Sequence, residues 1–213
     1  MEAVLEIPMQ AVLTKAEFNS TPKLYEMSVE KYHQLIEAGI FSKHDNVELI
    51  EGRIVEMSPK GVLHATAMTR IARCIIRKFD EQAVIRIQDP ILLNDKSEPE
   101  PDLVLAQLPE VRYMLHHPKP EDIYAVLEVS DSTLSYDRKE YAPWMARNGV
   151  LQFCLLNIRG RELEDYREPG VDGYRAKRTY SEEESFSLSA FPDISIRISD
   201  LLPPVLTNEE GSI

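Results

Sequence analysis

One apolar segment near the middle of the chain constrains the fold more than any other feature. Residues 123–129 read Ile-Tyr-Ala-Val-Leu-Glu-Val, so that apolar side chains occupy both odd and even positions. A strand of this kind is covered on both faces, as in a sheet between helical layers. Apolar residues also recur at helical spacing from Met68 to Phe79, which indicates an amphipathic helix. Helices alternating with buried strands predict an α/β fold (α+β in some schemes), with a mixed sheet flanked by helices.

Further elements are predicted around this strand and helix, bounded by Gly, Pro, Asn and Asp residues. A short helix follows Ser28 and ends at Gly39, and a hairpin spans 47–57 with its turn at Glu51-Gly52. A third helix is expected from about Asp137 to Arg147. The remaining predicted strands are 84–87, 90–93, 101–106, 151–156 and, as extra C-terminal strands or hairpins, 162–167, 174–179 and 194–198.

Length and composition indicate one globular domain. The chain has 213 residues, 43% hydrophobic and 28% charged, which matches ordinary globular proteins. We expect a flexible leader at 1–23, a single domain at 24–203 and a flexible tail at 204–213. No apolar run is long enough to span a membrane, so a cytoplasmic location is expected. Cys74 and Cys154 lack metal-ligand spacing, which favours buried, reduced thiols.

The distribution of charge is uneven. The net charge of −12 argues against a nucleic-acid partner, because phosphate binding draws on clustered Lys and Arg. The polar face of the helix around 68–79 nevertheless carries Arg70, Arg73 and Arg77. These arginines are candidates for nucleic-acid binding, and the alternative is a solvated helix face.

Two carboxylates border or interrupt the buried strands. Asp102 follows Pro101 at the start of one strand, and Glu128 lies inside the apolar segment 123–129. An ionised carboxylate in such a place needs a partner, a hydrogen bond or a metal. If the strands are neighbours, both side chains can offer oxygen ligands to Mg²⁺, which would stabilise charge on a phosphodiester. The alternatives are a salt bridge to Arg or Lys and an exposed strand end.

Several sequence motifs carry a resemblance to a known family. From Tyr32 to about Leu201 the chain resembles the Uma-type restriction-endonuclease-like proteins of the PD-(D/E)XK nuclease superfamily. The matching stretches are VELIEGRIVEMSP (47–59), HA (64–65), SEPEPDL (97–103), LEVSDSTL (127–134) and YDR (136–138).

The resemblance implies a restriction-endonuclease-like core and a metal-dependent cleavage of DNA. It implies that Asp102, Glu128 and the Val129 carbonyl hold Mg²⁺ or Mn²⁺. It makes Glu48 a supporting acidic ligand or base, with an exposed turn glutamate as the alternative. It also lets His64 contact phosphate or water, although a lone histidine more often packs at a helix start.

The chain departs from the family at one catalytic position. Relatives carry a lysine in the helix after the glutamate strand, where this sequence has Tyr141. Lys139 would point away from that position on a helix, but would share its face if the segment before Pro143 were extended. Tyr141 can orient a water but supplies no cation. The alternative function is therefore that of a nuclease-fold protein that binds nucleic acid or a protein partner without cleaving.

The sequence leaves the oligomeric state open, with a homodimer as the first candidate.

Overall fold

The computed structural model describes residues 24–42, 45–57 and 59–205. The expected leader and all but the first two residues of the expected tail lie outside the described residues. The strands are β1 (Val47–Ile50), β2 (Arg53–Glu56), β3 (Val84–Ile87), β4 (Leu103–Ala106), β5 (Ile123–Ser130), β6 (Gln152–Asn157), β7 (Glu162–Gly170), β8 (Gly173–Ser181), β9 (Ser185–Leu188) and β10 (Phe191–Arg197). The helices and helical turns are α1 (Val29–Glu37), α2 (Val62–Phe79), η2 (Glu110–Met114), η3 (Pro120–Asp122), α3 (Leu134–Tyr136), η4 (Asp137–Tyr141), α4 (Ala142–Arg147) and α5 (Ile198–Leu201).

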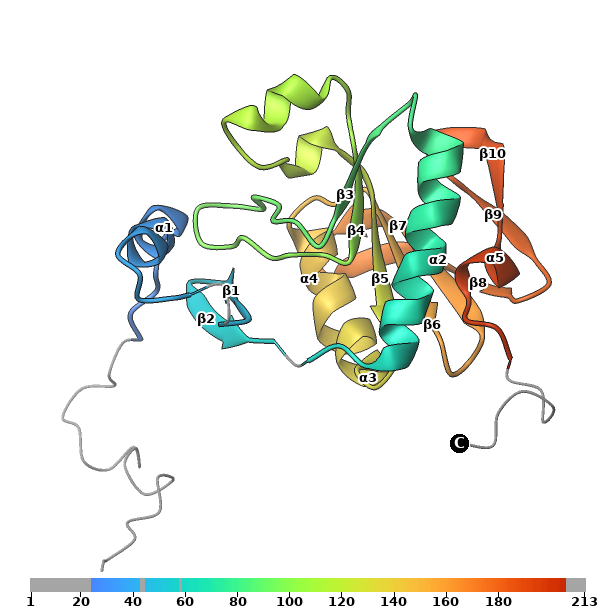
Figure 1. Ribbon diagram of the computed structural model, residues 1–213, viewed down its shortest axis with the longest axis horizontal. Helices are drawn as coiled ribbons and strands as arrows, with labels where there is room; N and C mark the ends of the chain where they lie inside the picture. The colour runs from blue at the N-terminus through green and yellow to red at the C-terminus, as the bar shows by residue number, and fades with distance from the viewer. Residues whose placement is uncertain (1–23, 43–44, 58, 206–213) are drawn as a thin grey trace, which may run out of the picture.

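A six-stranded sheet in the order β3-β4-β5-β6-β7-β8 forms the centre of the molecule (Figure 1). Every neighbouring pair is antiparallel except β5 and β6, which run parallel. Parallel neighbours need a crossover connection rather than a hairpin. The continuous helical segment α3–η4–α4 supplies it, so the end of β5 and the start of this segment lie at one edge of the sheet. The expected mixed sheet flanked by helices is confirmed.

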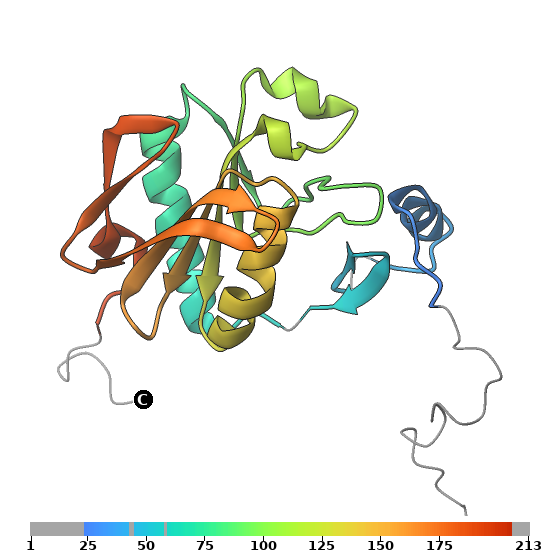
Figure 2. The same ribbon diagram turned by 180° about the vertical axis from the view of Figure 1, so that it is seen from behind.

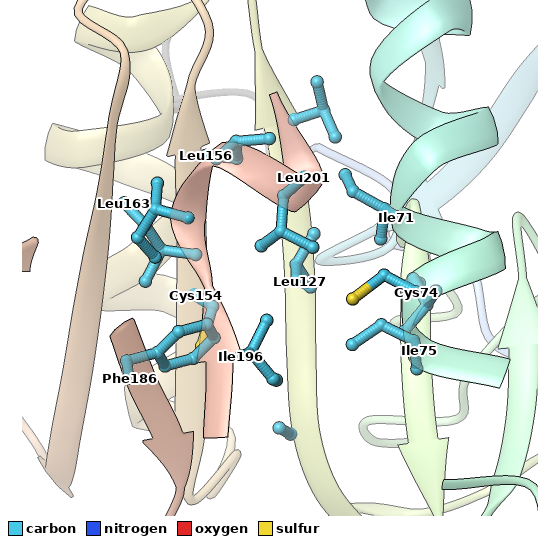
Figure 3. Packing of buried hydrophobic residues seen from close by; sticks show 14 of the residues in the cluster. Ile71, Cys74, Ile75, Leu127, Cys154, Leu156, Leu163, Phe186, Ile196 and Leu201 are labelled. Atoms are coloured by element: carbon cyan, nitrogen blue, oxygen red, sulfur yellow. The ribbon is translucent and has the colours of Figure 1, made fainter. Parts of the chain in front are cut away.

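The two faces of the sheet are covered by different layers. On one face, Ile71 and Ile75 of α2 pack on Leu127, together with the hairpin β9–β10 and α5 (Figure 3). On the other face, Trp144 and Met145 of α4 pack on apolar residues of β4, β5 and β6. This is why β5 is apolar at both odd and even positions. The hairpin β9–β10 lies beyond α2, away from α4 (Figures 1 and 2).

The hairpin β1–β2 and helix α1 form a smaller lobe beside the sheet (Figures 1 and 2). The Gly52 amide donates to the Lys96 carbonyl at 2.7 Å, and the Glu98 amide donates to the Leu49 carbonyl at 2.8 Å. Ser28 caps α1, because its hydroxyl accepts from the Lys31 amide. Backbone pairing between the hairpin and residues 94–98 therefore fixes the position of β1.

The predicted strand at 90–93 is wrong, although Ile91 and Leu93 are buried as a strand would require. The segment folds back on its own continuation, with the Ile91 amide donating to the Pro99 carbonyl and the Leu93 amide to the Ser97 carbonyl. These hydrogen bonds close a wide loop, and residues 90–93 form no strand of the six-stranded sheet. Strand β9 was not predicted, because its four residues carry only two buried apolar side chains.

Other expectations hold within the described part of the chain. Cys74 and Cys154 are free and buried, as predicted. None of the helices described is both long and apolar enough to cross a membrane.

The turn of the β1–β2 hairpin generates a stability prediction. Gly52 has φ +75° and packs so closely that an added Cβ would lie 2.8 Å from Glu26 Cβ and 3.0 Å from the Met27 backbone nitrogen. Gly39 has a similar φ of +72° but no heavy atom within 4 Å of an added Cβ. We expect Gly52→Ala to lower the free energy of unfolding by roughly 2 to 4 kcal/mol, and Gly39→Ala by roughly 1 to 2 kcal/mol. Urea unfolding of both variants measures this difference, and equal losses would contradict the steric part of the explanation.

Candidate active site

The register between β4 and β5 brings the two predicted carboxylates together. Leu103 pairs with Leu127 in this antiparallel ladder, and continuing the register by one residue sets Asp102 opposite Glu128. Opposite residues of an antiparallel pair project from the same face of the sheet. The Asp102 amide lies 3.4 Å from Glu128 Oε2. The structure therefore places both carboxylates at one edge of the sheet, and the contact of Asp102 with His64 brings them near the start of α2.

Asp102 is buried and held by groups from several elements. Its Oδ2 accepts from the Val129 amide at 3.0 Å and lies 2.9 Å from His64 Nε2 in the first turn of α2. Its Oδ1 accepts from Gln88 Nε2 at 3.3 Å and lies 3.5 Å from Lys60 Nζ. His64 thus contacts the Asp102 carboxylate through its Nε2. The sequence had left open whether His64 contacts a substrate or packs at the start of the helix.

The two carboxyl groups differ in their affinity for a proton. Burial is the largest single influence on Asp102 and disfavours its ionisation. The hydrogen bond and charge of His64, the interaction with Glu128 and the Val129 amide together lower the pKa of Asp102 to about 2. For Glu128, burial raises the pKa well above its ordinary value, and the negative charge of Asp102 raises it further. The pair therefore consists of an ionised aspartate beside a glutamate that resists ionisation.

Position 141 points into this site. Tyr141 is buried, and burial together with the nearby carboxylates of Glu128 and Glu48 raises the pKa of its phenol well above the ordinary value. The Tyr141 phenol therefore lies close to the Glu128 carboxyl group. A phenol, neutral and acting as donor or acceptor, stands at the position where the resemblance to the family implies a lysine.

Lys139 does not join the site. The extended alternative for this segment is wrong, because residues 134–147 are helical throughout and include a π-helical turn at 137–141. Two residues apart on a helix, the side chains at 139 and 141 point to different sides. Lys139 is exposed, and no hydrogen bond or ion pair to it is formed by the residues described.

Glu48 approaches the same site from the hairpin. It lies in β1 opposite Val55 and is only 7% exposed. Burial is the largest cause that raises its pKa to about 7; the charges of Glu100 and Asp102 add to this and the charge of Lys60 opposes it. Glu48 is therefore a buried carboxyl group near Asp102 rather than an exposed turn glutamate.

The arginines of α2 are not equivalent. Arg70 is partly buried, and its Nη2 donates to the Ser199 carbonyl at 3.0 Å, which ties α2 to α5. Arg73 and Arg77 are exposed. Of the three predicted arginines, Arg73 and Arg77 therefore face solvent, whereas Arg70 is engaged in a hydrogen bond within the protein.

The side chains at this edge include the oxygen donors that a divalent cation takes. Hard cations such as Mg²⁺ take carboxylate and carbonyl oxygens and keep several waters. The edge of the sheet offers the carboxylates of Asp102 and Glu128 close together, and a cation between them would offset the repulsion that raises the Glu128 pKa. Within the described ranges, no group of three or more His, Cys, Asp or Glu side chains is arranged as a metal site. The residues fit an ion that takes its other ligands from water, substrate and a backbone carbonyl.

Two residues near Asp102 were not predicted from the sequence. Lys60 lies in the segment that joins β2 to α2, and Gln88 follows β3 in a left-handed conformation with φ +54°. The Gln88 amide also donates to the Asp102 carbonyl at 3.2 Å. Nothing in local spacing marks either residue, because both contacts depend on how separate segments pack around Asp102.

Comparisons with known proteins agree with this architecture. The family model of Uma2, described as "Putative restriction endonuclease", matches residues 29–199. A crystal structure titled as a putative nuclease belonging to DUF820, from Anabaena variabilis, is similar at a TM-score of 0.61 and 12% sequence identity, covering 82% of this chain and 97% of that one. At this identity the likeness concerns the fold alone. Among curated proteins, none matches this chain.

Glu48 generates a prediction about pH. Its pKa is raised from 4.5 to about 7, so ionisation costs folding free energy, and stability falls as pH rises from about 4.5 through about 7. In EDTA, Glu48→Gln should therefore gain stability relative to wild type between about pH 5 and about pH 8, by on the order of 2 to 3 kcal/mol. Urea unfolding at both pH values measures this. The exposed Glu56 of the paired strand provides the control, and Glu56→Gln should leave the pH dependence unchanged; a flat Glu48→Gln difference would contradict the burial of this carboxyl group.

Proposed function

Because the chain belongs to the Uma2 family of restriction-endonuclease-like proteins, we propose that it is a metal-dependent endonuclease that hydrolyses phosphodiester bonds of DNA. The observation that carries the proposal is the pair of facing carboxylates, Asp102 and Glu128, at the edge of the sheet beside the start of α2. A buried aspartate beside a partly buried glutamate whose pKa is shifted the other way is typical of sites that bind a cation or transfer protons.

The ion proposed for this site is Mg²⁺ or Mn²⁺, held by Asp102, Glu128 and the Val129 carbonyl. When bound, such an ion stabilises negative charge on the phosphate that is cleaved. The His64 and Val129 hydrogen bonds keep Asp102 ionised and fix the direction of its carboxylate. These contacts exist before any substrate binds, so the Asp102 carboxylate is already oriented for the metal ion.

Glu48 fits the role of general base in this reaction. A group with a pKa of about 7 is partly ionised at neutral pH and can accept a proton efficiently there. In the hydrolysis, a water oxygen forms a bond to phosphorus and Glu48 takes a proton from that water. The bond between phosphorus and one ester oxygen breaks, and the leaving oxygen takes a proton from solvent.

Contacts to the rest of a duplex are assigned to exposed cations. Arg73 and Arg77 on α2 are exposed and face away from the core, so they can approach phosphates. The net charge of −12 makes binding depend on such local clusters and on the bound metal ion rather than on the whole surface.

Removal of either carboxylate tests the proposal. Wild-type protein with Mg²⁺ or Mn²⁺ is expected to nick supercoiled plasmid, and EDTA should abolish the activity. Asp102→Asn and Glu128→Gln should each lower the cleavage rate at least about 100-fold, because the ion supplies several kcal/mol of charge stabilisation. Calorimetry should show weaker Mn²⁺ binding in both variants.

The exposed Glu140 provides a matched control on the crossover segment, and Glu140→Gln should cleave like wild type. Circular dichroism establishes that each variant is folded. Folded Asp102→Asn and Glu128→Gln proteins that cut plasmid at the wild-type rate would reject this site.

A second candidate function rests on Tyr141. Its buried phenol lies close to Glu128, at the position where the resemblance to the family implies a lysine, so the chain could bind nucleic acid or a protein partner without cleaving. This alternative predicts that wild type is inactive and that Tyr141→Lys restores nuclease activity by at least about 100-fold, the size of effect typical for one charge-stabilising group. Plasmid cleavage by wild type and by Tyr141→Lys distinguishes the two functions, because robust cleavage by wild type excludes the second.

A further inference from the structure

The site contains one lysine that comes from a different segment than the lysine of relatives. Lys60 lies between β2 and α2, immediately before Gly61, the residue that caps α2. Its Nζ lies 3.5 Å from Asp102 Oδ1. That oxygen is the one not used by His64 and Val129, which both contact Oδ2.

Among the lysines and arginines that the structure describes, no other one supplies a positive charge at this place. Tyr141 is a phenol close to Glu128, and Lys139 is exposed without a partner among the residues described. Across the described part of the chain, no other lysine or arginine forms an ion pair with Asp102 or Glu128. The charge of Lys60 also acts on Glu48 and Glu100, so its ammonium group lies amid the acidic side chains.

The exposure of Lys60 suits a contact with substrate. Its side chain is 41% exposed, whereas that of Asp102 is 5% exposed. The lysine therefore reaches the buried carboxylate from the solvent side, where a phosphodiester would arrive.

We propose that Lys60 is a catalytic residue, whose ammonium group binds the scissile phosphate and replaces the lysine that relatives carry at position 141. This inference rests on the proposed nuclease function and assigns one further group to it. Lys60 keeps its proton throughout the hydrolysis. It donates hydrogen bonds to a non-bridging phosphate oxygen, on which negative charge increases as the water oxygen attacks phosphorus.

The main experiment measures plasmid cleavage in Mg²⁺ by four variants. Lys60→Ala should lower kcat about 100-fold or more, as removal of one charge-stabilising donor does elsewhere. Lys60→Arg, which keeps the charge, should stay within about tenfold of wild type, and Lys60→Ala/Tyr141→Lys should regain at least about tenfold over Lys60→Ala. Lys119→Ala is the control, since this exposed lysine lies before the opposite end of β5, and should cleave like wild type.

Binding provides a readout that does not depend on cleavage. In Ca²⁺, a short DNA duplex should bind Lys60→Ala several-fold more weakly than wild type, and the slope of log affinity against log salt should fall by about 1, as for one lost phosphate contact. Lys119→Ala should leave both quantities unchanged. Mn²⁺ binding and the urea midpoint should be retained in Lys60→Ala.

Each outcome decides the proposal. Cleavage by Lys60→Ala at the wild-type rate, or loss of Mn²⁺ binding and stability together with activity, would overturn the role of Lys60 while leaving the nuclease function standing. If wild type binds duplex but does not cleave it, the nuclease function is rejected. In that case, weaker and less salt-dependent duplex binding by Lys60→Ala still supports a contact between Lys60 and a phosphate. If duplex affinity is the same in both, or wild type binds none, the contact is rejected as well.

Discussion

The carboxylate of Asp102 is the point at which the separate parts of this molecule meet. One oxygen joins the amide of β5 to the imidazole of α2, and the other contacts the residue that follows β3 and the segment that leads into α2. A buried anion is stable only with such partners. The contacts that stabilise this charge also hold the first turn of α2 against the ends of β4 and β5. The geometry of the site and the packing of α2 on the sheet therefore depend on the same interactions.

The pKa values of the two acids at this edge are shifted in opposite directions. Asp102 receives the hydrogen bonds and stays ionised, while Glu128 receives the repulsion and holds its proton more tightly. Glu48 adds a third carboxyl group whose pKa lies near neutrality. A gradation of proton affinity across neighbouring acids lets one site bind a cation and accept a proton at the same pH.

Much of the fold and part of the site followed from sequence, for identifiable reasons. The apolar run at 123–129 predicted a doubly covered strand, and a charged residue inside it marked Glu128; both depend on local patterning. The resemblance to a family predicted that position 141 belongs to the site, and the structure places the Tyr141 phenol close enough to Glu128 for this carboxyl group to raise its pKa. The contact of Lys60 could not be predicted, because it depends on how a connecting segment crosses the end of β4. Pattern also misjudged residues 90–93, whose buried side chains belong to a loop that pairs with itself, and left open whether Lys139 lay on a helix.

The lobe formed by α1 and the β1–β2 hairpin has a consequence for the dynamics of the molecule. Its attachment consists chiefly of backbone bonds to residues 94–98. Ile50 packs against the apolar cluster beneath α4, but the buried Leu49 belongs to neither of the two large apolar clusters. A unit with few links to the main core opens at a lower free energy than the whole domain. Glu48 would leave with that unit, so partial opening separates one carboxyl group from the site while the sheet, α2 and the paired carboxylates remain folded.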